Sequence, residues 1–118
     1  MKRRLQIVAF LLSFAASPLV ALAHTHLEKS IPAANSAGPA PKQIDLEFSE
    51  AAQLTALVLQ QDGKKGEQKI GPLPAKAQTH IQIPAPMLSA GKYALKWRAL
   101  SDDGHVMSGT VHFTVAGK

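Results

Sequence analysis

The sequence contains no cysteine, and this absence limits both how the chain is stabilised and how it can bind a metal. No disulfide can hold the fold together, so a domain of this size must rely on its apolar core. A metal site would have to use imidazole, carboxylate, amine or thioether ligands. Such a donor set argues against a structural zinc site and favours Cu(II), which accepts nitrogen and oxygen ligands in a tetragonal arrangement.

Dense basic stretches are also absent beyond the first few residues. The formal net charge is +5, but Lys2, Arg3 and Arg4 account for three of the 13 basic residues. Residues 24–118 therefore carry ten Lys and Arg against eight Asp and Glu, and the lysines are scattered without accompanying aromatic side chains. We expect no binding to nucleic acid.

No apolar run is long enough to span a membrane as a helix; the longest, Leu5–Ala16, falls short of the length required. It follows Lys2-Arg3-Arg4 and precedes Ala21-Leu22-Ala23, which is the pattern of a secretory signal peptide with its cleavage site. The alternative is an uncleaved anchor. We predict a signal peptide over residues 1–23 and one exported domain over residues 24–118, with His24 as its first residue.

Apolar spacing typical of an amphipathic helix is missing from residue 24 onward, whereas strict alternation is frequent. The three clearest strands are expected at residues 42–50, 92–99 and 110–115. Weaker candidates occur at residues 24–31, 54–60, 64–70 and 79–83, separated by Asp62-Gly63 and by proline-rich turns. We therefore predict an all-β fold, a small antiparallel β-sandwich or barrel of about six or seven strands.

The candidate metal ligands come from two distant places. A first-residue His24 could chelate a metal with its α-amine and its ring Nδ1. Asp103 and His105 are two residues apart in an expected loop, so their side chains lean to the same side, and Gly104 permits tight bending between them. Together these groups form an N,N,N,O set suited to Cu(II). The alternative is that Asp103-Gly104 is an ordinary turn followed by an exposed histidine.

Three other histidines need separate interpretation. His26 would be the third residue after cleavage, and such a segment can wrap Cu(II) with its amine, two backbone amide nitrogens and the His26 imidazole. If Leu27 anchors this segment as a strand, those amides belong to the sheet and wrapping is blocked. We favour the folded site, with His26 peripheral. His80 and His112 alternate with apolar neighbours and should point outward.

A set of motifs follows in order along residues 24–118: His24–Leu27, Ser30–Ala33, Ala40-Pro41, Leu46–Glu50, Ala90–Tyr93, Trp97–Ser101, Asp103–His105 and Gly109–Val115. On these motifs the chain closely resembles the CopC family of periplasmic copper-resistance proteins. The resemblance implies an immunoglobulin-like Greek-key β-sandwich or barrel of about seven strands that binds Cu(II) in the periplasm. It also implies His24, Asp103 and His105 as ligands, with Glu50 as a nearby acid.

This sequence departs from some members of that family in having no methionine-rich loop, because residues 51–86 contain no methionine. Met87 and Met107 are isolated and are interpreted as packing residues, so we predict a Cu(II)-only protein. We expect it to sequester or deliver copper as a monomer and not to act as an enzyme. A CopD-like inner-membrane copper transporter is the partner implied by the resemblance.

The alternative from another functional class is a copper-dependent oxidative enzyme with an N-terminal histidine brace. An aspartate in the metal loop would fill a position that an oxygen-activating site keeps open. A third possibility is an interaction module that works through a sheet edge, with the metal incidental.

Overall fold

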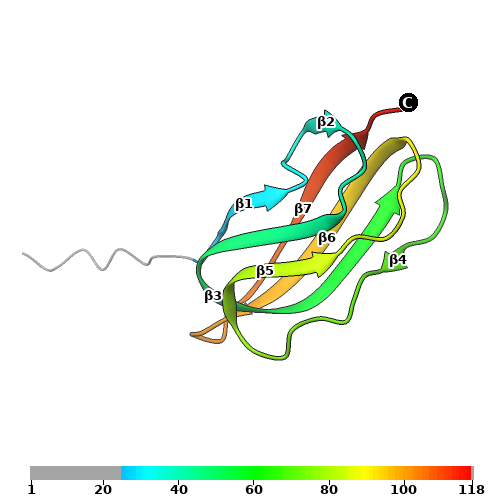
Figure 1. Cartoon of the computed structure of the whole chain (residues 1–118). Helices are drawn as coiled ribbons and strands as arrows, with labels where there is room; N and C mark the ends of the chain where they lie inside the picture. The colour runs from blue at the N-terminus through cyan, green and yellow to red at the C-terminus, as the bar shows by residue number, and fades with distance from the viewer. Residues whose placement is uncertain (1–24, 118) are drawn as a thin grey trace, which may run out of the picture.

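The computed structural model describes residues 25–117, which form seven β-strands and no helix (Figure 1). No helix in this part of the chain is available to cross a membrane. The predicted all-β class and strand number are confirmed, whereas the predicted signal peptide, residues 1–23, lies outside the described residues. The strands are β1 Leu27–Ile31, β2 Ser36–Gly38, β3 Gln43–Gln61, β4 Gln68–Lys69, β5 Gln78–Pro84, β6 Gly91–Ser101 and β7 Val106–Val115.

The long strand β3 joins the two layers of a curled sheet. Its first part pairs with β1 and β5, and its second part pairs with β6 and β4. The strand order runs β1-β3-β6-β7-β2, with β4 and β5 branching from β3. The sequence predicted two strands here, at 42–50 and 54–60, and this was wrong. Register shifts between Glu47 and Ala52 and between Leu54 and Ala56 let one strand bend without ending.

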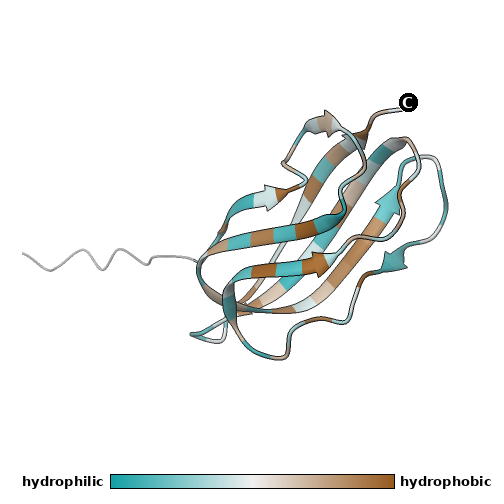
Figure 2. Ribbon diagram, viewed as in Figure 1, coloured by the Kyte–Doolittle hydropathy of each residue, from teal (hydrophilic) through white to brown (hydrophobic). Residues whose placement is uncertain are grey.

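The core lies inside the curl and follows from the alternation of the strands, which is visible as alternating bands on β3 and β5 (Figure 2). Leu46, Ile81 and Leu95 are fully buried. Phe48 packs edge-on against Trp97, with ring centroids 5.3 Å apart. These contacts fix the first part of β3 against β6 and so hold the end of the domain that carries the candidate ligands.

The two short strands and the exposure of Met87 differ from what the sequence predicted. Strand β2 pairs with β7 in parallel, in a segment where the sequence predicted no strand. The strand expected over residues 64–70 is reduced to the two residues of β4. Met87 is fully exposed, so its interpretation as a packing residue was wrong, whereas Met107 does pack against the core.

Candidate metal centre

The predicted ligand pair lies in the tight loop between β6 and β7. The backbone N–H of Ser101 donates to the carbonyl oxygen of His105 at 2.9 Å, and the N–H of Gly104 donates to the carbonyl oxygen of Ser101 at 3.0 Å. Gly104 has a φ of 85°, in the left-handed region that favours glycine. The loop is therefore closed by its own backbone and supported by the two longest core strands after β3.

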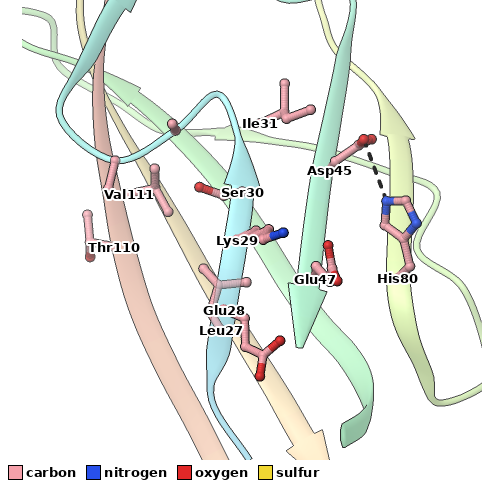
Figure 3. Close-up of a pocket in the computed structure, with 12 residues that line it drawn as sticks. Leu27, Glu28, Lys29, Ser30, Ile31, Asp45, Glu47, His80, Thr110 and Val111 are labelled. Atoms are coloured by element: carbon pink, nitrogen blue, oxygen red, sulfur yellow. Dashed lines mark ion pairs between the residues drawn. The ribbon is translucent and has the colours of Figure 1, made fainter. Parts of the chain in front are cut away.

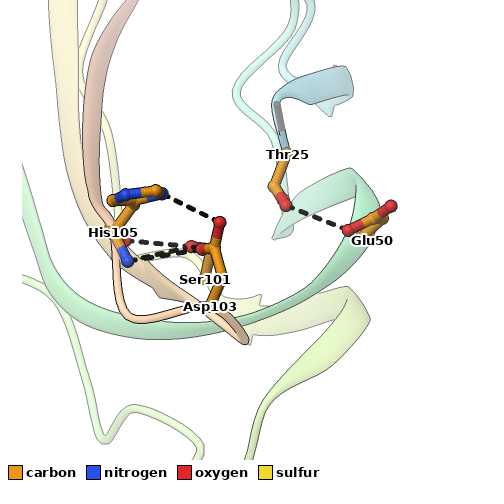
Figure 4. A network of polar contacts seen from close by, with 5 residues as sticks. All are labelled: Thr25, Glu50, Ser101, Asp103 and His105. Atoms are coloured by element: carbon orange, nitrogen blue, oxygen red, sulfur yellow. Dashed lines mark hydrogen bonds and ion pairs between the residues drawn. The ribbon is translucent and has the colours of Figure 1, made fainter. Parts of the chain in front are cut away.

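Asp103 and His105 converge within this loop (Figure 4). The Oδ2 atom of Asp103 lies 2.8 Å from Nδ1 of His105, and the two side chains are 65% and 74% exposed. The donor atoms are thus close to one another and open to solvent. The two side chains point to the same side of the loop, as predicted. Two donors so placed can share one metal ion.

Ser101 bonds to both Asp103 and His105. Its hydroxyl donates to Oδ1 of Asp103, and it accepts the backbone N–H of His105 at 3.2 Å. The same His105 N–H lies 3.4 Å from Oδ1 of Asp103. Ser101 is buried, unlike the two side chains that it supports. A buried hydroxyl with two loop partners reduces the conformational freedom of Asp103 and His105.

The same contacts keep the Asp103 carboxyl ionised. The hydrogen bond from Ser101 is the largest influence and lowers the pKa of Asp103 below its ordinary value of 3.8. Desolvation is the next largest influence and opposes this effect, while the backbone N–H and the charge of His105 add to it. Asp103 is therefore a negatively charged oxygen donor throughout the neutral pH range.

The start of the described chain reaches the same end of the domain. The N–H of Ser49 donates to the carbonyl oxygen of His26 at 2.9 Å, and three residues later Ala52 pairs with Ser101. Thr25, the first described residue, donates its hydroxyl to Oε2 of Glu50 at 3.4 Å (Figure 4). Residues 49–52 of β3 thus link the N-terminal segment to the loop between β6 and β7. His24 itself lies outside the described residues.

The other predicted residues are placed differently from the loop pair. Glu50 is exposed and contacts Thr25, and the Nε2 atom of His26 lies 4.0 Å from Oε1 of Glu28. Among residues 25–117, no group of three or more His, Asp and Glu side chains is arranged to hold a metal ion. Asp103 and His105 supply two donors, so a complete site needs a further donor, and His24 is the predicted one.

A separate hollow of about 720 Å³ lies beside β1, away from the loop (Figure 3). It contains the pair formed by His80 and Asp45, whose Nε2 and Oδ2 atoms are 3.6 Å apart, and neither Asp103 nor His105 lines it. His80 is exposed, as is His112 on β7, so the predicted outward placement of both is confirmed.

Sequence reasoning assigned no role to two serines that the structure places at this end. Ser101 supports the loop pair, and Ser49 accepts the backbone N–H of His26 at 3.0 Å. Serine side chains in turns commonly bond to nearby backbone groups, as Ser101 does with the His105 N–H, so Ser101 could have been identified. Ser49 could not, because its partner is 23 residues away and depends on the β1–β3 register.

Comparisons with known proteins agree with this architecture. The family model for the CopC domain matches residues 27–116. Copper resistance protein C of Escherichia coli is 37% identical over 105 residues, covering 80% of this chain and 83% of that protein. Copper resistance protein C of Pseudomonas syringae pv. tomato is 38% identical over 120 residues, covering 91% and 94%.

Solved structures give the same result. The crystal structure of PcoC, a copper resistance protein from Escherichia coli, matches with a TM-score of 0.57 and 31% identity, over 77% of this chain and 99% of that one. CopC from Methylosinus trichosporium OB3b matches with a TM-score of 0.62 and 27% identity, over 78% and 93%. The chain belongs to the CopC domain family, and the resemblance read from its motifs is confirmed.

Proposed function

We propose that this protein is an exported copper-binding protein of copper resistance, which holds Cu(II) in the periplasm through His24, Asp103 and His105. The observation that carries the proposal is the convergence of Asp103 and His105, at 2.8 Å, on a loop braced by Ser101. The relatives named copper resistance protein C, from Escherichia coli and Pseudomonas syringae, support the copper assignment.

The donor set supports the divalent ion. Cleavage after Ala23 would give His24 a free α-amine beside its imidazole, and Asp103 and His105 would add one oxygen and one nitrogen. Soft sulfur donors are not gathered among the described residues, because Met87 is exposed on a loop and Met107 packs against the core. Glu50 and His26 remain peripheral, as acid neighbour and alternative ligand.

The proposed role is equilibrium binding, in which the monomeric domain sequesters copper or passes it to an inner-membrane transporter of the CopD type. No covalent step is involved. An oxidative enzyme of the histidine-brace type is disfavoured by the position of the Asp103 carboxylate, which lies against His105 where such an enzyme needs an open coordination position. The exposed loop allows the metal to enter and leave without opening the core.

The test begins with mass spectrometry of the exported protein, which should place the mature N-terminus at His24. Cu(II) titration followed by EPR should then give one ion per chain with mainly nitrogen ligands. Asp103→Ala and His105→Ala should each lower the affinity by about 100-fold. His112→Ala is the matched control, because His112 is exposed about 20 Å further along β7. Unchanged affinity in both loop variants, or a different N-terminus, would overturn the proposal.

A further inference from the structure

Two ways of binding Cu(II) compete at the mature N-terminus, and they make opposite demands on one backbone amide. In the loop mode, His24 works together with Asp103 and His105. In the wrapped mode, the metal takes the α-amine, the backbone nitrogens of Thr25 and His26 and the His26 imidazole. An amide nitrogen that binds Cu(II) has lost its proton, so it can no longer donate a hydrogen bond.

The structure gives the His26 amide an acceptor on β3. Leu27 pairs with Phe48 at the start of β1, beyond a register shift between Leu27 and Lys29. Beyond this pair, the Ser49 N–H still donates to the His26 carbonyl oxygen at 2.9 Å. In the opposite direction, the acceptor is not a backbone carbonyl oxygen. The His26 N–H donates at 3.0 Å to the side-chain hydroxyl of Ser49. One hydroxyl therefore provides the acceptor for the amide that wrapping would need.

We propose that Ser49 is a positioning residue that selects the loop mode by holding the His26 amide, an inference that rests on the proposed function. Ser49 itself does not bind the metal. Removing its hydroxyl leaves the Ser49 N–H bonded to the His26 carbonyl oxygen, so the strand persists while the amide loses this acceptor. The contact between Thr25 and Glu50, at 3.4 Å, tethers the preceding residue and acts in the same direction.

The experiment uses the protein starting at His24 and titrated with copper sulfate, with visible absorption and EPR as readouts. Backbone amide nitrogens are stronger-field ligands than a carboxylate, so wrapping moves the copper d–d band to shorter wavelength. In Ser49→Ala, the amide-bound fraction near pH 8 should rise about tenfold. Binding should also become insensitive to Asp103→Ala. Ser49→Thr, which retains a hydroxyl, should behave like wild type.

Two further variants isolate the mechanism. Adding His26→Ala to Ser49→Ala removes the wrapping imidazole and should restore the wild-type spectrum. Ser30→Ala is the matched control, because the Ser30 hydroxyl also lies in this segment but donates to the carbonyl oxygen of Pro32. If Ser49→Ala does not fold, Ser49→Val replaces it and is compared with Ser49→Thr, which has nearly the same shape.

The outcomes separate this inference from the function on which it rests. If wild type binds copper without needing Asp103 and His105, the proposed function fails. If wild type needs them and Ser49→Ala or Ser49→Val keeps the wild-type spectrum up to pH 9, only the role of Ser49 is wrong. The same conclusion follows if the Thr and Val variants behave alike.

Discussion

Replacing Ser101 by alanine should weaken copper binding although Ser101 is not a proposed ligand. The substitution removes the hydroxyl that donates to Asp103 and accepts the His105 N–H at 3.2 Å. Both donor groups then lose the contact that holds them on one side of the loop. Because Ser101 is buried at the end of β6, alanine fits the space and the strand pairing with Ala52 should survive.

The magnitude follows from the bond to the backbone. A neutral intramolecular hydrogen bond contributes about 1 kcal/mol to the folded loop. If the copper-binding conformation loses this stabilisation of about 1 kcal/mol, the copper affinity should fall by about fivefold. The lost contact with Asp103 acts in the same direction. It should also raise the pKa of Asp103 toward its ordinary 3.8, because the Ser101 hydroxyl is the main cause of the lowered value.

The affinity is measured by competition with a copper chelator of known strength, and the Asp103 pKa by NMR titration of its carboxyl carbon without metal. Val111→Ala is the control for general destabilisation, since Val111 is buried in β7 and its truncation costs about 2 kcal/mol without touching the loop. Wild-type affinity and an unchanged Asp103 pKa in folded Ser101→Ala would refute the argument that the hydroxyl organises the pair.

Three other predictions concern the N-terminus, pH and the core. One glycine added before His24 converts its amine to an amide and should lower Cu(II) affinity at least 100-fold; equal affinity in a chelator competition would contradict this. Affinity should fall steeply below about pH 6, because protons compete for the imidazoles and the amine. The lowered pKa of Asp103 keeps its carboxylate charged until below pH 3.8, so it does not cause that fall, and a flat titration profile from pH 7 to 5 would exclude this ligand set. Gly109→Ala should cost about 1–3 kcal/mol in thermal unfolding, since the added Cβ would lie 2.7 Å from the Trp97 ring, whereas Gly38→Ala, which meets nothing within 4 Å, is the control.

The fold class could be predicted because alternation is a local property of each strand. In the strand predicted over residues 42–50, the apolar residues Ile44, Leu46 and Phe48 alternate with polar ones, and all three are buried. The continuity of β3 could not be predicted, because a bend with register shifts looks like a strand break in sequence. The parallel pairing of β2 with β7 was missed because its three residues carry no alternation and depend on partners far along the chain.

Sequence spacing was sufficient to predict that the two loop residues lie close together. It was insufficient to predict the contacts that surround them. The proximity of Asp103 and His105 was predicted because two residues in one turn are neighbours whatever the rest of the fold does. The contact of Glu50 with Thr25 depends instead on which residue of β3 faces the N-terminal segment. Local chemistry can therefore be read from the sequence, while the contacts that orient the ligands require the register.

The two serines connect two exposed parts of the chain to the sheet. Asp103 and His105 are mostly solvent-exposed, so the core cannot fix them by packing. Ser101 instead connects the loop to the end of β6, and Ser49 connects the N-terminal segment to β3. Both serines belong to strands that pair with each other, at Ala52 and Ser101. The β3–β6 ladder thereby sets the spacing between the chain start and the loop, so a metal ion that binds both parts would meet donors already positioned by the sheet.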